Sequence, residues 1–322
     1  MNSKRIPLGR IGVALIALLM LCASAQAGYP LAIEHAQGTL TLDEAPKRVA
    51  VFDLGVLDTL DALGIAVAGV PQMVGPAYLK NRYGAREAVN IGTLFEPDQA
   101  ALERLKPDLI IIGGRSSNQF EMLATLAPTI DLSIAPDQFL AGVRSNIKVL
   151  GEIFDKQGQA AQLDAELRQE LAAVHAKTAG QSSLTLFTIN DALILHAPGE
   201  RFGMLNEVLG TRSVVETVDP ASVPQGRPAP DSPEARELRE RQRVRLQAAL
   251  KEQPQWLVIL DRGAATGGEG KGVETLGKHA GIAASPAWQQ GKVFYLEPAT
   301  WYIATGGYQG LMRTLKDFAA AQ

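Results

Sequence analysis

Two stretches of the chain share an arrangement that restricts the fold more than any other feature. Residues 106–117 (KPDLIIIGGRSS) and 253–270 (QPQWLVILDRGAATGGEG) each place a proline before an unbroken apolar run. An arginine follows eight positions after that proline in both stretches, at Arg115 and Arg262. Apolar runs of this length are typical of strands buried on both faces of a parallel sheet. The repeat therefore predicts an α/β protein with two similar, Rossmann-like lobes.

The segments around these two stretches alternate between strand and helix patterns. The first half contains RVAVF followed by a helical pattern that ends LDALG at Gly64, and the second half contains LTLFTI followed by one that ends NEVLG at Gly210. This alternation is typical of βα units, and the internal match supports a duplicated lobe. We expect an N-terminal lobe at 28–140 and a C-terminal lobe at 180–322.

The segment 141–179 separates the two expected lobes. Its apolar residues keep helical spacing from Val143 to Val174. It predicts a single connecting helix that would be about 50 Å long at 1.5 Å per residue. Gly151 and Gly158 weaken this helix, so a break or kink is expected near 158. The alternative is two ordinary helices within one lobe.

The N-terminus has the pattern of a secretory signal. Three basic residues precede an apolar core at 11–21, and Ala25-Gln26-Ala27 is a small-x-small cleavage site. We expect cleavage of residues 1–27 and a periplasmic location, with an uncleaved anchor as the alternative. Cys22 is the only cysteine. A lipid anchor at Cys22 is disfavoured because bulky Leu21 precedes it, and cleavage after Ala27 would remove it.

The charge of the chain excludes one class of partner. The formal net charge is −3, and loss of the three basic residues of the signal makes it −3 − 3 = −6. No overall basic character points to nucleic acid. Cleavage would also leave no thiol for disulfides or thiolate metal sites.

Arginines at the ends of strands are the first candidate site residues. Ligands of open α/β sheets bind outside the carboxyl ends of the strands, which is where Arg115 and Arg262 are expected. Arg201 lies in a comparable loop before a helix of the second lobe. A guanidinium is always charged and offers a planar fork of donors for delocalised anions. In the alternative, Asp261 and Glu200 neutralise the arginines beside them.

The other patterns are less specific. The segment 263–272 (GAATGGEGKG) is not a phosphate-binding P-loop, because Ala265 and Gly272 replace required residues. No histidine pair has metal-ligand spacing, and no nucleophile–base pattern argues for catalysis. Trp301 and Tyr302 are expected in a loop after a strand, where a phenolate would suit Fe(III). Their alternative role is loop packing.

Taken in order, these motifs resemble the periplasmic siderophore-binding proteins of bacterial ABC iron importers. The similarity is to the subgroup that takes catecholate-type siderophores such as petrobactin, and it covers essentially the whole chain after the signal. It is carried by RVAVFDLGVLDTLDALG, NIGTLFEPD, KPDLIIIGGR, GERFG, LVILDRGAATGGEG and the Trp-Tyr pair. The resemblance implies two α/β lobes joined by one long helix, with the ligand in a shallow cleft between them.

The resemblance also implies roles for particular residues. Arg115, Arg201 and Arg262 would form a basic triad around the anionic ferric complex. Independently of the resemblance, we expect the aromatic loop residues, including Trp301, to pack against the ligand. Tyr302 would ligate iron directly when the siderophore leaves coordination sites open.

The chain departs from the family pattern in one place. Some family members carry an iron-binding histidine before the charged helix, and Gln225 stands in its place here. The resemblance therefore does not carry a histidine–tyrosine pair onto this chain. The family docks its permease through surface glutamates, for which Glu96, Glu103 and Glu207 are the candidates.

We therefore expect a monomeric binding protein, not an enzyme. It would capture a ferric siderophore, hold no permanent cofactor and deliver its ligand to an ABC importer permease at the inner membrane. A haem- or corrinoid-binding protein of the same architecture is the first alternative. An exported α/β enzyme acting on an anionic substrate is the second.

Overall fold

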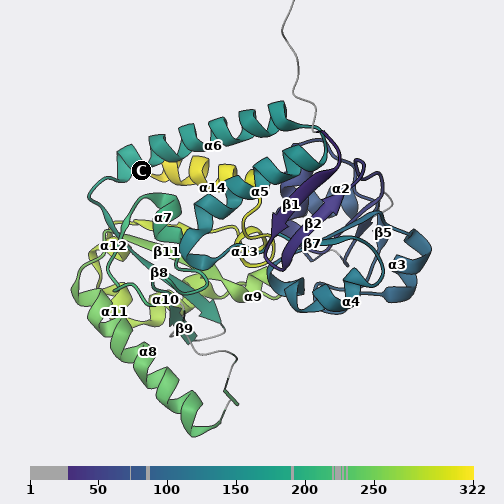
Figure 1. The fold of residues 1–322 in the computed structure, drawn as a ribbon. Helices are drawn as coiled ribbons and strands as arrows, with labels where there is room; N and C mark the ends of the chain where they lie inside the picture. The colour runs from purple at the N-terminus through teal and green to yellow at the C-terminus, as the bar shows by residue number, and fades with distance from the viewer. Residues whose placement is uncertain are drawn as a thin grey trace, which may run out of the picture.

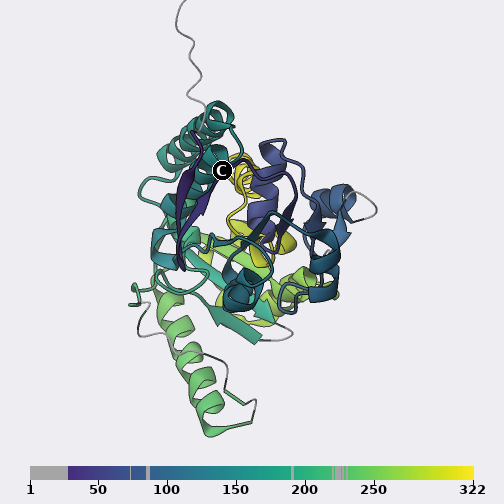
Figure 2. The ribbon, with the colours of Figure 1, turned by 45° about the vertical axis from the view of Figure 1, so that its right-hand side comes forward.

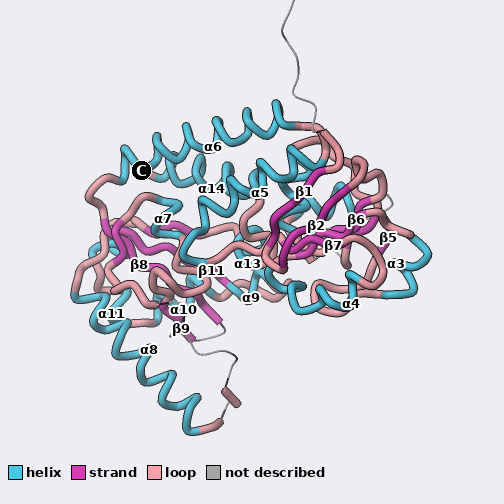
Figure 3. Tube along the Cα trace, in the orientation of Figure 1, coloured by secondary structure: helices cyan, strands magenta, loops and turns pink. Residues whose placement is uncertain are grey.

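The computed structural model describes residues 28–72, 74–84, 88–189, 192–219, 221, 226, 228–229 and 231–322. Two α/β lobes lie side by side, and helices cross from one to the other along one edge (Figure 1). The strands form two separate groups, one in each lobe (Figure 3). The two-lobed α/β class is thus confirmed. The predicted signal, 1–27, and Gln225 lie outside the described residues.

The N-terminal lobe is built on a parallel sheet of five strands in the order β5-β4-β3-β6-β7. The order reverses at β3, because the chain moves outward to β4 and β5 and then returns to place β6 on the other side of β3. Ligands of open α/β sheets bind at such a reversal. All four residues of β6 are buried, as its apolar run predicts. The strands are β3 (Val49–Val51), β4 (Gly69–Val70), β5 (Val89–Asn90), β6 (Leu109–Ile112) and β7 (Thr129–Asp131).

Short helices cover this sheet, and an antiparallel hairpin precedes it. The hairpin consists of β1 (Leu31–His35) and β2 (Gly38–Leu42). Asp53 begins the first helix, because its Oδ1 accepts from the main-chain N–H groups of Gly55 and Val56 at 2.8 and 2.9 Å. The helices are α1 (Leu54–Ala62), α2 (Ala77–Tyr83), α3 (Gln99–Leu105), α4 (Phe120–Ala124) and the 3₁₀ helices η1 (Gly114–Gln119) and η2 (Pro136–Gln138).

The C-terminal lobe repeats this plan. Its main strands are parallel in the order β10-β8-β11-β12, and β9 pairs antiparallel with β8. Here the reversal lies between β8 and β11, which correspond to β3 and β6 of the first lobe. The two strands named by the repeated sequence motif, β6 and β11, thus hold equivalent places. The strands are β8 (Ser182–Ile189), β9 (Ala192–Leu195), β10 (Arg212–Ser213), β11 (Trp256–Asp261) and β12 (Val293–Tyr295).

One helix of this lobe projects away from the rest of the molecule. It is α8, and the projection is visible both in Figure 1 and after the 45° turn of Figure 2. The helices of the lobe are α7 (Leu205–Leu209), α8 (Pro233–Lys251), α9 (Arg262–Ala265), α10 (Gly272–Lys278), α11 (Ala280–Ala283), α12 (Pro286–Gln289) and α13 (Pro298–Tyr302). No helix in the described part of the chain is long and apolar enough to cross a membrane.

The connection between the lobes differs from the predicted single helix. Two helices, α5 (Phe139–Ile153) and α6 (Gln157–Thr178), replace it, and the break falls at 154–156, close to the position near 158 where a break was expected. Asp155 has a left-handed backbone with φ of 54°. Arg144 of α5 pairs with Asp164 of α6 at 2.5 Å, so the helices form an antiparallel hairpin. Only α6, about 33 Å long at 1.5 Å per residue, runs toward the second lobe.

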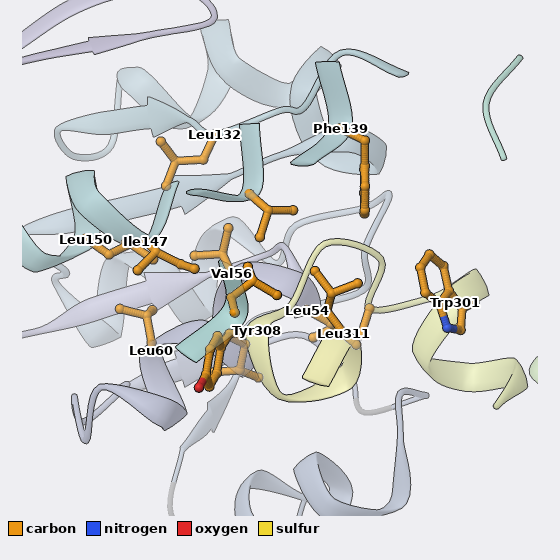
Figure 4. Packing of buried hydrophobic residues seen from close by; sticks show 14 of the residues in the cluster. Leu54, Val56, Leu60, Leu132, Phe139, Ile147, Leu150, Trp301, Tyr308 and Leu311 are labelled. Atoms are coloured by element: carbon orange, nitrogen blue, oxygen red, sulfur yellow. The ribbon is translucent and has the colours of Figure 1, made fainter. Parts of the chain in front are cut away.

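A shared apolar core joins the lobes. Figure 4 shows residues of α1, α5, α13 and α14 (Tyr308–Ala321) packed together. The carboxylate of Asp58 in α1 accepts from the main-chain N–H groups of Gln309 and Gly310 at 2.6 and 3.1 Å. It thereby caps the C-terminal helix from the opposite lobe, and the hydroxyl of Tyr78 also donates to it. The lobes are therefore held together by α14 as well as by α6.

Candidate functional site

Arg115 lies where the first sheet reverses its order. Residues Gly113 and Gly114 lead from β6 into η1, and Gly114 has φ of +48°. A Cβ on Gly113 would lie 2.9 Å from a carboxylate oxygen of Asp53, so glycine is needed for the chain to pass this close to the end of β3. The turn directs Arg115 toward the second lobe.

Arg262 holds the equivalent place in the second lobe as the first residue of α9. The alternative in which Asp261 neutralises it is not what the structure shows. The Asp261 carboxylate instead accepts from the main-chain N–H groups of Ala264 at 3.2 Å and Gly272 at 2.6 Å. Asp261 therefore fixes the glycine-rich loop and leaves the guanidinium of Arg262 to other partners.

Tyr302 connects the arginines of the two lobes. Its phenolic oxygen accepts a hydrogen bond from Nε of Arg262 at 2.8 Å, and its main-chain carbonyl accepts one from Nη2 of Arg115. The guanidinium carbons of Arg115 and Arg262 lie 4.8 and 5.4 Å from the centre of its ring. These distances are within the range of cation–π attraction. Tyr302 ends helix α13 rather than occupying the predicted loop.

Arg201 lies on the second lobe, beside an aromatic residue that sequence reasoning missed. Its guanidinium carbon is 4.9 Å from the ring centre of Phe202, which in turn stacks on Tyr302 with centroids 6.0 Å apart. Glu200 does not neutralise Arg201, because its carboxylate pairs with Arg245 at 3.0 Å. The GERFG motif contained a signal for Phe202, since an aromatic directly follows the candidate arginine.

These residues surround a pocket between the lobes. It encloses about 790 Å³, including the solvent at its mouth. Arg115, Arg201, Phe202 and Tyr302 line it, whereas Arg262 lies just behind the phenolic oxygen of Tyr302. The structure thus brings the three predicted arginines and Tyr302 together.

The three arginines make the pocket strongly electropositive. Within the described residues, none of them forms a salt bridge. Burial lowers the pKa of Arg201, and the nearby charge of Arg115 lowers it further. Tyr302 opposes this shift, whereas the charge of Arg262 adds to it. Three cations without carboxylate partners are the arrangement that an anionic ligand neutralises.

One acidic group lies at the floor of the pocket. It is Asp53, the only carboxylate among the pocket-lining residues. Burial raises the pKa of Asp53, and the N–H groups of Val56 and Gly55 oppose that shift, as does the charge of Arg115. The carboxyl is thus held by the N-terminus of helix α1, and within the described residues it forms no salt bridge with the arginines.

Trp301 does not belong to the pocket, contrary to the prediction. Only 2% of the residue is exposed, and its Nε1 donates to the hydroxyl of Thr314 at 2.8 Å. Its ring lies 6.2 Å from that of Phe139 in the apolar core (Figure 4). Neighbouring residues on a helix point about 100° apart, so Trp301 faces the core when Tyr302 faces the cleft.

The remaining candidates are less informative. Glu96, Glu103 and Glu207 are all exposed, with the first two on the N-terminal lobe and the third on the C-terminal lobe. The described residues contain no cluster of three or more histidine, cysteine or acidic side chains able to hold a metal ion. Tyr302 is therefore the only predicted metal contact that the pocket contains.

Comparisons with known proteins identify the family of this chain. A family model described as "Periplasmic binding protein" matches residues 49–300. The chain is similar to the petrobactin-binding protein YclQ of Bacillus subtilis, with 30% identity over 276 residues that cover 84% of this chain and 81% of the relative. It is also similar to the ferric-anguibactin-binding protein FatB of Vibrio anguillarum, with 27% identity over 296 residues covering 89% and 86%.

Solved structures show the same fold. The crystal structure of YclQ matches with a TM-score of 0.77 at 26% identity, covering 90% of this chain and 98% of YclQ. The structure of the siderophore-binding protein BauB, bound to a complex of two acinetobactin molecules and ferric iron, matches with a TM-score of 0.74 at 25% identity. That match covers 91% of this chain and 98% of BauB.

Proposed function

Since the chain belongs to the periplasmic binding protein family, we propose that it captures an anionic ferric siderophore and delivers it to an ABC importer. It works in the periplasm as a monomer, after removal of residues 1–27, and holds no permanent cofactor. Its ligand is of the catecholate type. Relatives named for petrobactin and ferric anguibactin support a siderophore as the ligand.

The observation that carries the proposal is the unpaired arginine triad. Arg115 enters from one lobe and Arg201 and Arg262 from the other, and within the described residues none has a carboxylate partner. Exposing three like charges to one another costs free energy that only an anion recovers. A ferric tris-catecholate carries about three negative charges, which matches the triad in sign and number.

Aromatic rings prepare the arginines for this role. Each guanidinium lies over a ring, Arg201 over Phe202 and the other two over Tyr302. The rings attract the cations without neutralising them and restrict their rotamers, so less conformational entropy is lost when a ligand binds. The pocket is thus largely organised before the ligand arrives.

Tyr302 is the proposed contact to the iron of the cargo. Its oxygen borders the pocket and accepts from Arg262, while its carbonyl is held by Arg115. A phenolate oxygen is a hard donor that suits Fe(III). Because one protein oxygen occupies at most one coordination position, the siderophore supplies the other donors. A hexadentate siderophore would leave Tyr302 as a hydrogen-bonding partner only.

Equilibrium titration of the chain from residue 28 with ferric siderophores tests the proposal. We expect the wild-type chain to bind a ferric tris-catecholate tightly. In an Arg115→Ala/Arg262→Ala variant, each lost arginine should weaken the affinity about tenfold to hundredfold. The matched control, Arg168→Ala/Arg243→Ala, removes the same charge from exposed helices and keeps wild-type affinity.

Three outcomes would contradict the proposal. Wild-type affinity in the Arg115→Ala/Arg262→Ala variant would show that the triad does not bind the ligand. Failure of the wild-type chain to bind any ferric siderophore, together with haem or corrin absorption in the purified protein, would favour the haem or corrinoid alternative. Turnover of an anionic substrate would revive the enzyme alternative.

A further inference from the structure

Phe95 is an exposed aromatic residue beside the pocket. It is 56% exposed, and it is the only one of the nine phenylalanines, all of which lie in described residues, that is exposed. A large apolar ring in water costs free energy, and a ring at the rim of a binding cleft recovers that cost when it is covered. The loop after β5 that carries Phe95 did not enter the sequence-based site.

The loop holds Phe95 in place rather than leaving it free. Its ends are joined by a bridge between Gly92 and Pro97. The hydroxyl of Thr93 accepts from the main-chain N–H groups of Phe95 at 3.2 Å and Glu96 at 3.0 Å. The side chain of Gln119 donates to the carbonyl of Phe95 at 3.0 Å. The backbone is therefore ordered while the side chain is exposed.

The ring of Phe95 faces Arg115, one member of the arginine triad. The guanidinium carbon of Arg115 lies 5.9 Å from its centre and 4.8 Å from the centre of Tyr302. Arg115 thus lies between two aromatic rings, one from each lobe, and Phe202 continues this row beyond Tyr302. A planar anionic ring that binds Arg115 would meet Phe95 at the edge of the pocket.

We propose that Phe95 stacks on an aryl ring of the bound ligand and so selects aromatic iron chelates over aliphatic ones. This inference rests on the proposed function, and it identifies the part of the ligand that the rim of the N-terminal lobe contacts. Catecholate rings offer an electron-rich face to Arg115 and an apolar face or edge to Phe95. Citrate-type chelates can satisfy the arginines by charge but have no ring for Phe95.

The test compares two ligands on three proteins, the wild type and two variants. Wild type, Phe95→Ala and Phe95→Tyr are titrated with a ferric tris-catecholate built from 2,3-dihydroxybenzoyl groups and with ferric citrate. We expect Phe95→Ala to weaken binding of the catecholate about three- to tenfold, with ferric citrate unchanged and Phe95→Tyr close to wild type. The matched control is Val273→Ala, which shortens an apolar side chain that is 61% exposed elsewhere.

The outcomes separate this inference from the proposed function. Equal catecholate affinity in wild type and Phe95→Ala, with Arg115→Ala still weakened, overturns the inference alone. Equal losses for both ligands also overturn it, because selection by the ring is then absent. A wild-type chain that binds neither ferric complex overturns the proposed function and this inference together.

Discussion

Nε of Arg262 donates a hydrogen bond to the phenolic oxygen of Tyr302 across 2.8 Å. Arg115, from the other lobe, donates to the main-chain carbonyl of the same residue. Because Arg262 supplies the hydrogen of the first bond, the hydroxyl hydrogen of Tyr302 is left for another acceptor. One tyrosine is thus fixed by both lobes while part of its bonding capacity faces the pocket.

Replacing Tyr302 by phenylalanine separates the ring from the oxygen. The ring still supports Arg115 and Phe202, so we expect affinity for a hexadentate ferric tris-catecholate to fall less than about tenfold. A tetradentate bis-catecholate leaves iron positions open. With that ligand, wild type should shift the visible charge-transfer absorption of the ferric complex, and Tyr302→Phe should not. Identical spectra for the two proteins would rule out a direct Tyr302–iron bond.

Substitutions at Arg201 separate the contribution of its charge to ligand affinity from the contribution of its planar shape. Arg201→Ala is expected to weaken ferric tris-catecholate binding about tenfold to hundredfold, whereas Arg201→Lys keeps the charge but loses the planar contact with Phe202, and should fall between. The difference between wild type and Arg201→Ala should shrink as sodium chloride rises, because salt screens the charge. Titrations at two salt concentrations measure both effects. Equal affinity of all three proteins would place Arg201 outside the site.

His196 makes folding stability depend on pH. Its ring packs against Phe187 and Phe202 at 4.3 and 5.4 Å. Burial, with the charges of Arg245 and Arg201, lowers the pKa of His196 to about 4. The unfolded chain therefore binds a proton at higher pH than the folded one, so stability is full above about pH 6.5 and is lost as pH falls toward 4.

A urea denaturation series from pH 7.5 to 4.5 measures this effect. The free energy of unfolding of wild type, relative to His196→Gln, should fall with decreasing pH by up to about 3 kcal/mol. The difference between the two proteins isolates His196 from the other groups that titrate in this range. A difference that does not change with pH would contradict the prediction.

Trp301 is expected to support folding and not binding. Trp301→Phe removes the hydrogen bond to Thr314 and leaves a small cavity, so we expect a loss of about 1–3 kcal/mol of stability. Affinity for the ferric siderophore should remain within about twofold of wild type, because the ring does not reach the pocket. Thermal denaturation and ligand titration of the same sample measure the two quantities. Weaker binding at unchanged stability would show that Trp301 contributes to ligand binding.

The sequence alone was enough to locate the strands and the arginines. The apolar runs before Arg115 and Arg262 are local signals, because a strand buried on both faces needs apolar residues at every position. Ligands of open α/β sheets bind outside the carboxyl ends of the strands, so Arg115 in one lobe and Arg262 in the other were each predictable as ligand contacts. Gly64 and Gly210 end equivalent helices in left-handed conformations, as their positions in the two matching motifs suggested.

Tertiary structure alone decided which neighbours these residues have. Glu200 pairs with Arg245, 45 positions away, rather than with adjacent Arg201, because α8 brings Arg245 to it. Such a choice depends on how elements pack, which no local pattern contains.

The same reason explains the direction of Trp301 and Tyr302. Both are aromatic and consecutive, and only the packing of α13 against the core determines which one is buried. The break between α5 and α6 likewise follows from their packing as a hairpin. Local composition therefore determined the strands and the charges, whereas contacts between distant segments determined which side chains reach the cleft.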